Sequence, residues 1–254
     1  MRCLLYYITD RSQFRGDERA RRKALLAKVA EAACACVDYI QLREKDLSGR
    51  ELETLAREAV GLVREISPST RLLINSRTDV ALVAGADGVH LRSDDVGPRE
   101  VRSALERFSP QGLKPAFLSS TSGTTEVVPF PKPAHIGSPV ATFRSPAHQP
   151  PATDHFLVAT SCHTAANVFR AESDKADFAV FAPVFEKKGA AGTQPASLAA
   201  LREACWAKIP VLALGGITIE NAESCLDAGA AGVAGIRLFQ ENKIEGVVRA
   251  LRAL

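Results

Sequence analysis

Tyr39-Ile40-Gln41-Leu42-Arg43-Glu44-Lys45 is the stretch that says most about the fold and the chemistry of this chain. In an extended strand, alternate side chains share one face, so Gln41, Arg43 and Lys45 lie together while the aliphatic residues face the other way. A fully buried strand normally carries aliphatic residues on both faces. An amide and two cations at the carboxyl end of a strand suit a phosphate or a pyrophosphate. The alternative is a solvated edge strand that ends in a charged turn.

Strand-like and helix-like patterns alternate on both sides of this stretch. Short apolar or β-branched runs predict strands at Cys3–Thr9, Val37–Arg43, Arg71–Asn75, Asp87–Leu91, Phe156–Ser161, Phe178–Pro183, Val211–Leu214 and Gly232–Ile236. Helical patterns lie around 17–34, 48–66, 77–84, 98–107, 164–175, 197–206, 219–228 and 243–253. Such alternation with short connections is typical of parallel β/α proteins, and eight units favour a closed barrel over an open sheet. We therefore expect residues 1–254 to form one α/β domain, a single (β/α)8 TIM barrel.

An internal similarity supports the barrel. Ala84-Gly85-Ala86-Asp87-Gly88-Val89 resembles Ala228-Gly229-Ala230-Ala231-Gly232-Val233, and the two segments enter the predicted fourth and eighth strands. A barrel built from two related halves would show such a similarity four units apart. Ala- and Gly-rich junctions that arose independently are the alternative.

Residues 108–154 interrupt the alternation. This segment has no clean periodicity and contains nine of the 14 prolines of the chain. So long a connection without regular structure is unusual inside a compact domain. We interpret it as a Pro-rich surface insertion between the fourth helix and the fifth strand, with an active-site lid as the alternative.

Composition excludes several classes of function. A net charge of +3, with Lys and Arg scattered along the chain, does not favour a nucleic-acid partner. No apolar run approaches the roughly 20 residues that span a bilayer, and the amino terminus does not resemble a signal peptide. The six cysteines include no Cys-x-x-Cys pair, as expected of reduced thiols. We expect a cytoplasmic protein without membrane or nucleic-acid partners, and a homo-oligomer is left open.

Polar residues and glycines follow several of the predicted strands. In a β/α barrel the active site lies at the carboxyl ends of the strands, where these residues meet. They are Gln41, Arg43, Lys45, Asn75, Asp94, Asp95, Ser161, His163, Lys187, Lys188, Gly215, Gly216, Ile236 and Arg237. Each has a simpler explanation alone, such as a cap or a solvated charge, but together they predict one site for small phosphorylated substrates.

Two short segments need separate interpretation: the first predicts a phosphate-binding turn, and the second does not predict a catalytic nucleophile. The glycines of Gly215-Gly216-Ile217-Thr218 would let backbone N–H groups approach a phosphate beside a helix N-terminus, although a plain left-handed turn is the alternative. Ser161-Cys162-His163 is no nucleophile dyad, because neighbours on a strand face opposite ways. His163 is a candidate for proton transfer or hydrogen bonding, or else a structural residue. His90 is expected to be structural.

With these residues in place, the chain resembles the thiamine phosphate synthase/thiazole tautomerase (TenI) family. The matching motifs occur in family order and span nearly the whole chain outside the insertion. They are Tyr7-Ile8-Thr9-Asp10, Gln41-Leu42-Arg43-Glu44-Lys45, Leu73-Ile74-Asn75, the segment from Ala84 to Leu91 with Asp95, Ser161-Cys162-His163-Thr164 and Gly215-Gly216-Ile217-Thr218.

The resemblance implies a transferase of thiamine biosynthesis. Such a synthase joins hydroxymethylpyrimidine pyrophosphate to thiazole phosphate and yields thiamine phosphate and pyrophosphate. The resemblance implies that Ser161 contacts the pyrimidine, Gly216 binds the thiazole phosphate and Asp95 binds Mg²⁺, and that four residues hold the pyrophosphate: Gln41, Arg43, Lys45 and Asn75. The positions at the strand ends add His163 and Lys188 as catalytic candidates beside Ser161, and add substrate-binding candidates: Gly215, Ile236 and Arg237.

Two departures from the family pattern favour other activities. Ser76 stands where synthases carry a magnesium-binding Asp, and a hydroxyl is a poorer ligand for Mg²⁺ than a carboxylate. The loop after the sixth strand reads Glu186-Lys187-Lys188-Gly189-Ala190 instead of the Thr-x-Thr-Lys pattern. The alternatives are therefore a TenI-type tautomerase, which acts on a thiazole carboxylate phosphate with His163 as acid/base, and a non-catalytic phosphate-binding relative. A sugar-phosphate isomerase fits less well, because the Gln-x-Arg-x-Lys segment argues against it.

Overall fold

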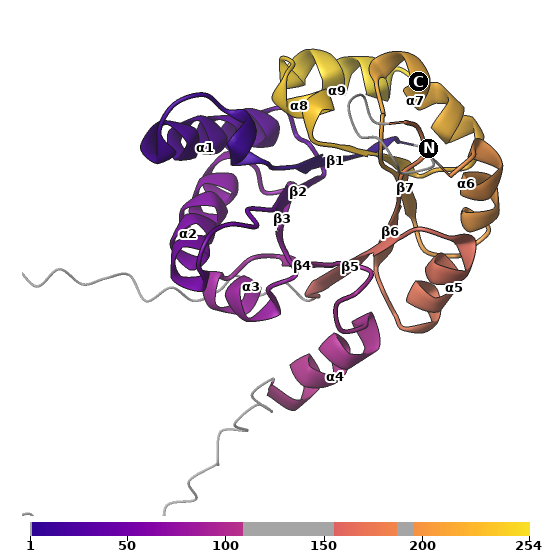
Figure 1. Cartoon of the computed structure of the whole chain (residues 1–254), viewed down its shortest axis with the longest axis horizontal. Helices are drawn as coiled ribbons and strands as arrows, with labels where there is room; N and C mark the ends of the chain where they lie inside the picture. The colour runs from indigo at the N-terminus through magenta and orange to yellow at the C-terminus, as the bar shows by residue number, and fades with distance from the viewer. Residues whose placement is uncertain (1, 109–154, 187–195) are drawn as a thin grey trace, which may run out of the picture.

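The structure is a computed structural model that describes residues 2–108, 155–186 and 196–254. Its eight strands pair in parallel, each with the next along the chain, and β8 closes on β1. The described part is therefore the predicted (β/α)8 barrel, with helices around a ring of strands (Figure 1). The strands are β1 Leu4–Ile8, β2 Tyr39–Leu42, β3 Arg71–Asn75, β4 Gly88–Leu91, β5 Leu157–Cys162, β6 Phe178–Phe181, β7 Val211–Ala213 and β8 Gly232–Gly235.

The helices begin close to where the sequence predicted them. Asp17 caps one helix and Ser48 another, the latter with Glu51 in the expected capping box. Beyond the eight predicted helices, the described residues add a short 3-10 helix, η1, and a four-residue helix, α8. The helical elements are η1 Arg11–Gln13, α1 Glu18–Cys34, α2 Gly49–Ile66, α3 Thr78–Ala84, α4 Pro98–Phe108, α5 Ala165–Ser173, α6 Leu198–Ala204, α7 Ile219–Asp227, α8 Arg237–Gln240 and α9 Ile244–Arg252.

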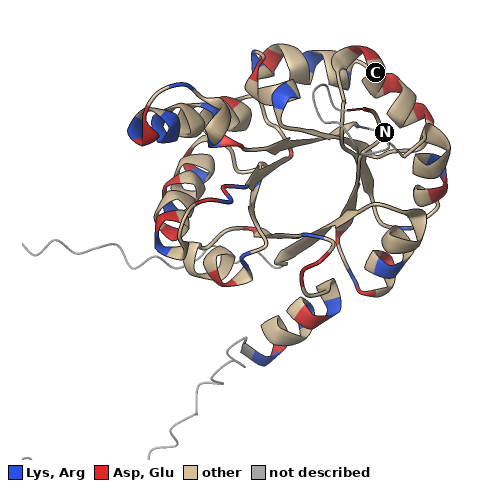
Figure 2. Cartoon of the chain, viewed as in Figure 1, with Lys and Arg blue, Asp and Glu red and all other residues tan. Residues whose placement is uncertain are grey.

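Alternation along each strand separates two cores. Tyr6 and Ile8 of β1 belong to the small cluster inside the barrel, together with Phe178 of β6. Leu5 and Tyr7 belong to the large cluster between strands and helices. Charged residues gather on the outer helices, while most of the strand ribbon carries none (Figure 2). Over the residues that the structure describes, no helix is long and apolar enough to cross a membrane.

Three aspartates fix the amino-terminal end of the barrel. Asp38, Asp87 and Asp177 stand just before β2, β4 and β6, and each accepts a hydrogen bond from a backbone N–H of the preceding strand. Asp87, for example, accepts from the N–H of Leu72 at 2.8 Å. These bonds lie at the end of the strands opposite to the predicted site, so they hold the register of the sheet without taking part in the chemistry.

Six of the eight strands are shorter than predicted, most by one or two residues. β2 ends at Leu42 and β6 at Phe181, so Arg43 lies in the loop after β2. The Pro-rich segment does fall between α4 and β5, and α4 points away from the ring of helices in Figure 1. Residues 109–154 lie outside the described residues, so a surface insertion and a lid both remain predictions.

Candidate active site

The carboxyl end of the barrel contains a cavity of about 740 Å³. Among the described residues, all the predicted catalytic and substrate-binding residues line it: Gln41, Arg43, Lys45, Asn75, Ser161, His163, Gly215, Gly216, Ile236 and Arg237. They come from five different strand ends, so the barrel brings together residues nearly 200 positions apart in sequence. Lys188, the remaining catalytic prediction, lies outside the described residues, as does Lys187.

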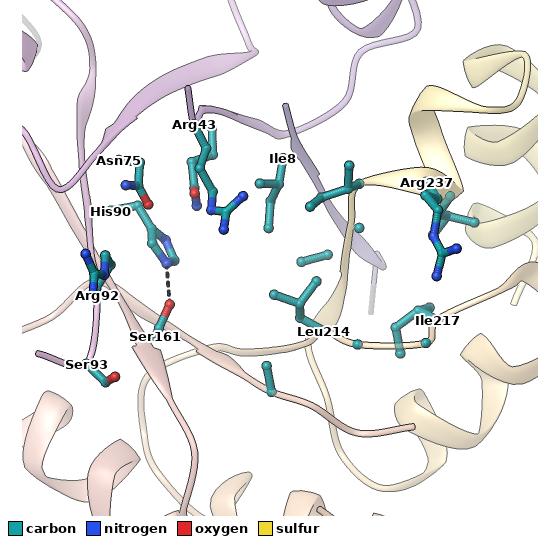
Figure 3. Close-up of a pocket in the computed structure, with 18 of the residues that line it drawn as sticks. Ile8, Arg43, Asn75, His90, Arg92, Ser93, Ser161, Leu214, Ile217 and Arg237 are labelled. Atoms are coloured by element: carbon teal, nitrogen blue, oxygen red, sulfur yellow. Dashed lines mark hydrogen bonds between the residues drawn. The ribbon is translucent and has the colours of Figure 1, made fainter. Parts of the chain in front are cut away.

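The polar side chains of the cavity form two groups. Figure 3 shows Arg43, Asn75, His90 and Ser161 at one side of the cavity. Arg237 lies at the opposite side, and the apolar side chains of Ile8 and Leu214 lie between. Two cationic ends separated by an apolar floor can hold two anionic groups of different molecules while the rest of each molecule meets in the middle.

A buried network holds the loop that carries Arg43. The Thr9 hydroxyl accepts a hydrogen bond from the Arg43 N–H at 3.0 Å and donates to Glu44 at 2.6 Å. Glu44 also accepts from the N–H of Arg11 at 3.0 Å and from its guanidinium at 3.2 Å. Burial raises the pKa of Glu44, and these donors counteract that effect. Because these contacts bury the Glu44 side chain under the loop, away from the cavity, its neighbours Arg43 and Lys45 face the cavity.

The Gly215–Gly216 turn can only be made by glycine. Both residues have positive φ, 102° and 63°. A Cβ at Gly216 would lie 2.5 Å from the carbonyl oxygen of Glu186, and one at Gly215 would lie 2.7 Å from Pro183. The turn therefore packs closely against the loop after β6 and lines the cavity with backbone alone, which is the kind of surface that a phosphate-binding turn needs.

His90 is the site residue that the sequence analysis underrated. Its ring lies inside the barrel, 3% exposed, and its Nε2 is 2.8 Å from the Ser161 hydroxyl, the contact dashed in Figure 3. Burial, and then the charge of Arg43, lower the pKa of His90 to about 3, so the ring is neutral at physiological pH. The available signal was that His90 and Tyr6 both occupy inward positions of their strands.

The His163 ring is held through its Nδ1, which leaves its Nε2 on the cavity side. Its Nδ1 lies 2.7 Å from the carbonyl oxygen of Ala182, which can only accept, so Nδ1 carries the proton when the ring is neutral. Nε2 is then free to accept, and the Ser93 hydroxyl is 3.3 Å away. Cys162 next to it is buried among the outer core residues, and burial raises its pKa to about 12. The Cys162 thiol is therefore buried and protonated, whereas the His163 Nε2 carries a lone pair and His163 lines the cavity.

Few donors for a metal face the cavity. Asp95 does not line it; the carboxylate accepts a hydrogen bond from the Arg92 N–H at 2.7 Å and borders an adjoining cavity of about 340 Å³, which shares Ser93 and Ser161 with the main one. Asp94 is the acidic residue among the described lining residues, and it pairs with Arg92. The part of the chain that the structure describes contains no cluster of three His, Cys, Asp or Glu side chains that could hold an ion. These residues fit Mg²⁺ only if most of its ligands come from substrate phosphate oxygens and water.

Comparison with known proteins gives one consistent family. The thiamine monophosphate synthase family model matches residues 5–108 and 135–239, and so omits part of the Pro-rich segment. A putative thiamine-phosphate synthase 2 of Aquifex aeolicus is 32% identical over 93% of this chain and 97% of its own length. A thiamine-phosphate synthase of Methanoculleus marisnigri is also 32% identical, over 98% of this chain and 93% of its own.

Solved structures support the fold. Thiamine phosphate pyrophosphorylase from Pyrococcus furiosus superposes with a TM-score of 0.67 at 23% identity, covering 98% of this chain and 94% of that one. A 3-hexulose-6-phosphate synthase superposes with a TM-score of 0.58 at 16% identity, covering 100% of this chain and 99% of that one. At these identities the likeness shows the barrel alone, because many activities share this fold.

Proposed function

Since this chain belongs to the thiamine monophosphate synthase family, we propose that it joins hydroxymethylpyrimidine pyrophosphate to thiazole phosphate, forming thiamine phosphate and releasing pyrophosphate. The observation that carries the proposal is the pair of cationic ends in one cavity, with Arg43 and Asn75 at one side and Arg237 beyond an apolar middle. Two phosphorylated substrates need such an arrangement, whereas an isomerase acting on a substrate with a single anionic group needs only one cationic end.

Bond breaking takes place at the pyrophosphate end of the cavity. The C–O bond between the pyrimidine methylene and the pyrophosphate breaks with its electron pair leaving on oxygen, and the thiazole nitrogen forms the new C–N bond. Arg43, Lys45 and Asn75 are placed to hold the leaving group, and their charge and N–H donors stabilise the negative charge that develops on it. Gln41 lines the same side and belongs with the pyrophosphate-binding candidates, and Ser161 is the candidate to hold the pyrimidine.

The opposite end binds the acceptor. The bare backbone of Gly215 and Gly216 and the side chain of Arg237 are placed to hold the thiazole phosphate. Ile217 and Leu214 offer an apolar surface beside it. Holding both substrates in one cavity turns their reaction into an intramolecular one, which contributes to the rate independently of any charge effect.

The proposal includes a Mg²⁺ ion that would bind together with the pyrophosphate. When bound, it would neutralise charge on the leaving group. Asp95 is the candidate ligand from the chain, with Asp94 nearer the cavity, and Ser76 leaves the family's second carboxylate absent.

A second function has two specific observations in its favour. The basic Nε2 of His163 and the loss of a carboxylate at Ser76 suit a TenI-type tautomerase, which moves a proton on a thiazole carboxylate phosphate and needs no metal. For that reaction Arg43 and Lys45 have no pyrophosphate to hold, which is why we place it second.

The test is an assay of the purified full chain with both synthase substrates and Mg²⁺. Thiamine phosphate and pyrophosphate should form in equal amounts, with the Methanoculleus marisnigri relative as the positive control. If the relative is active and this chain forms no product, the synthase proposal is wrong. Proton exchange into the thiazole carboxylate phosphate, abolished by His163→Ala, would then support the tautomerase, and phosphate binding without either reaction would support a binding protein.

A further inference from the structure

Three buried polar side chains and the half-buried Ser161 form a continuous hydrogen-bonded chain across the inside of the barrel. The Gln41 Nε2 donates to the Tyr6 hydroxyl at 3.0 Å. The same hydroxyl is 3.2 Å from the His90 Nδ1, and the His90 Nε2 is 2.8 Å from the Ser161 hydroxyl. These residues come from β1, β2, β4 and β5, and both Gln41 and Ser161 reach the cavity.

The direction of this chain follows from counting hydrogens. The Tyr6 hydroxyl has one proton, and its oxygen already accepts from Gln41, so the proton points to the His90 Nδ1. Neutral imidazole carries one N–H, and since Nδ1 accepts, the proton of His90 lies on Nε2. The His90 Nε2–H then donates to the Ser161 oxygen. The Ser161 proton is left to point elsewhere, and the cavity is on that side.

We propose that Tyr6 and His90 are positioning residues that fix the Ser161 hydroxyl as a hydrogen-bond donor to the substrate in the cavity. The inference rests on the proposed function only in naming that substrate, which is the pyrimidine substrate. A ring nitrogen with a lone pair is the kind of acceptor that such a donor selects. Neither Tyr6 nor His90 needs to touch the substrate or change charge for this role.

Packing holds the chain in this geometry. The Tyr6 ring contacts Tyr39 and Phe178 edge-on, with ring centroids 5.8 and 5.5 Å apart, and Tyr39 stacks on Phe178 at 4.7 Å. Tyr6 is fully buried, and burial strongly raises the pKa of its hydroxyl, so it remains protonated. A reversed chain, with Ser161 donating to His90, would need the Gln41 amide turned over so that its oxygen accepts from Tyr6.

The first measurement is the ¹⁵N NMR spectrum of His90 in the purified wild-type protein without substrate. The shifts of the two ring nitrogens report which one carries the proton. We expect Nε2 protonated and Nδ1 unprotonated; a protonated Nδ1 would overturn the proposal. Because this measurement needs no turnover, it tests the chain of hydrogen bonds even if the protein forms no thiamine phosphate.

The second measurement is the kinetics of Tyr6→Phe, which keeps the ring and removes the hydroxyl. Loss of an orienting partner of this kind typically costs about 10- to 100-fold in activity. We expect kcat/KM for the pyrimidine substrate to fall by that amount and KM for the thiazole phosphate to stay unchanged. In the ¹⁵N spectrum of the variant, the proton should no longer be confined to Nε2.

Tyr39→Phe is the matched control, because it removes a hydroxyl from the same aromatic cluster without touching the hydrogen-bonded chain. Its kinetics and its His90 spectrum should match the wild type. Equal effects of the two substitutions, or an equal rise of both KM values in Tyr6→Phe, would show that Tyr6 acts through general packing and would overturn the proposal.

Discussion

At the scale of one residue, the proposed pyrophosphate role depends most directly on Arg43. Its backbone is fixed by Thr9, and its guanidinium reaches into the cavity on the same side as Asn75. Arg43→Ala should lower kcat/KM for the synthase reaction by about 10²- to 10³-fold, the usual cost of losing one donor to a developing negative charge. Arg77→Ala is the control, because Arg77 is exposed and paired with Asp79. If Arg43→Ala reduced synthase and tautomerase activities equally, the pyrophosphate role would be wrong.

Ser76 tests the magnesium argument. It has a positive φ of 60°, a conformation that Asp and Asn adopt more readily than most residues, so Ser76→Asp should be tolerated. The added carboxylate would offer Mg²⁺ a better ligand than the hydroxyl, so the activity should saturate at a lower Mg²⁺ concentration. Magnesium titration of initial rates measures this, with Ser76→Asn as the uncharged control. No difference between the two variants would count against a metal site at this position.

His90 makes stability depend on pH. Its pKa is about 3 in the folded protein against an ordinary value of 6.5, so between these values the unfolded chain binds a proton that the folded chain does not. The contribution is present above pH 6.5 and is lost as the pH falls towards 3, with a slope of up to about 1.4 kcal/mol per pH unit. The free energy of unfolding, measured with urea at several pH values, should depend less steeply on pH for His90→Gln than for the wild type. Parallel curves would contradict a buried neutral His90.

The residues at strand ends were predictable, and the contacts between them were not. Gln41, Arg43 and Asn75 were found because polar residues at the carboxyl ends of parallel strands must meet. Tyr6 and His90 were missed as partners because the stagger of the strands decides which inward side chains face each other across a barrel. The sequence positions of Tyr6 and His90 do not show that these two side chains meet inside the barrel.

At the level of elements, the glycines show why the sequence revealed the architecture. Gly88 begins β4 and Gly232 begins β8, and a Cβ at either would lie within 2.2 Å of a backbone oxygen of the neighbouring strand. The two similar segments of the sequence therefore meet the same steric demand four units apart. What the pattern did not show was the short α8, because four residues are too few to display a helical period.

The aspartates before the even-numbered strands should affect stability and leave the chemistry alone. Asp87→Ala leaves the Leu72 N–H without its partner in a buried position, at a cost of about 1–3 kcal/mol in free energy of unfolding. Denaturant unfolding measures the loss, while kcat/KM should remain at the wild-type value. Asp227→Ala is the control, because Asp227 is exposed at the end of α7. A large loss of activity in folded Asp87→Ala would contradict the separation of the two barrel ends.

At the scale of the whole molecule, closure of the barrel turns scattered residues into one site. Residues from Gln41 to Arg237 share a cavity because all eight strands are parallel and end on the same rim. Asp95 was the exception. It follows β4 closely in the sequence, so we expected its carboxylate at the rim, but the loop turns that carboxylate back to the Arg92 backbone. Loop conformation of this kind depends on local hydrogen bonds that no periodicity reveals.

A crystal structure of the protein with thiamine phosphate and pyrophosphate bound would test the central claim most directly. The pyrophosphate should lie against Arg43 and Asn75 and the phosphate of thiamine phosphate against Gly216 and Arg237, with the pyrimidine beside Ser161. Pyrophosphate bound away from Arg43, or the two anions bound in separate cavities, would contradict the account.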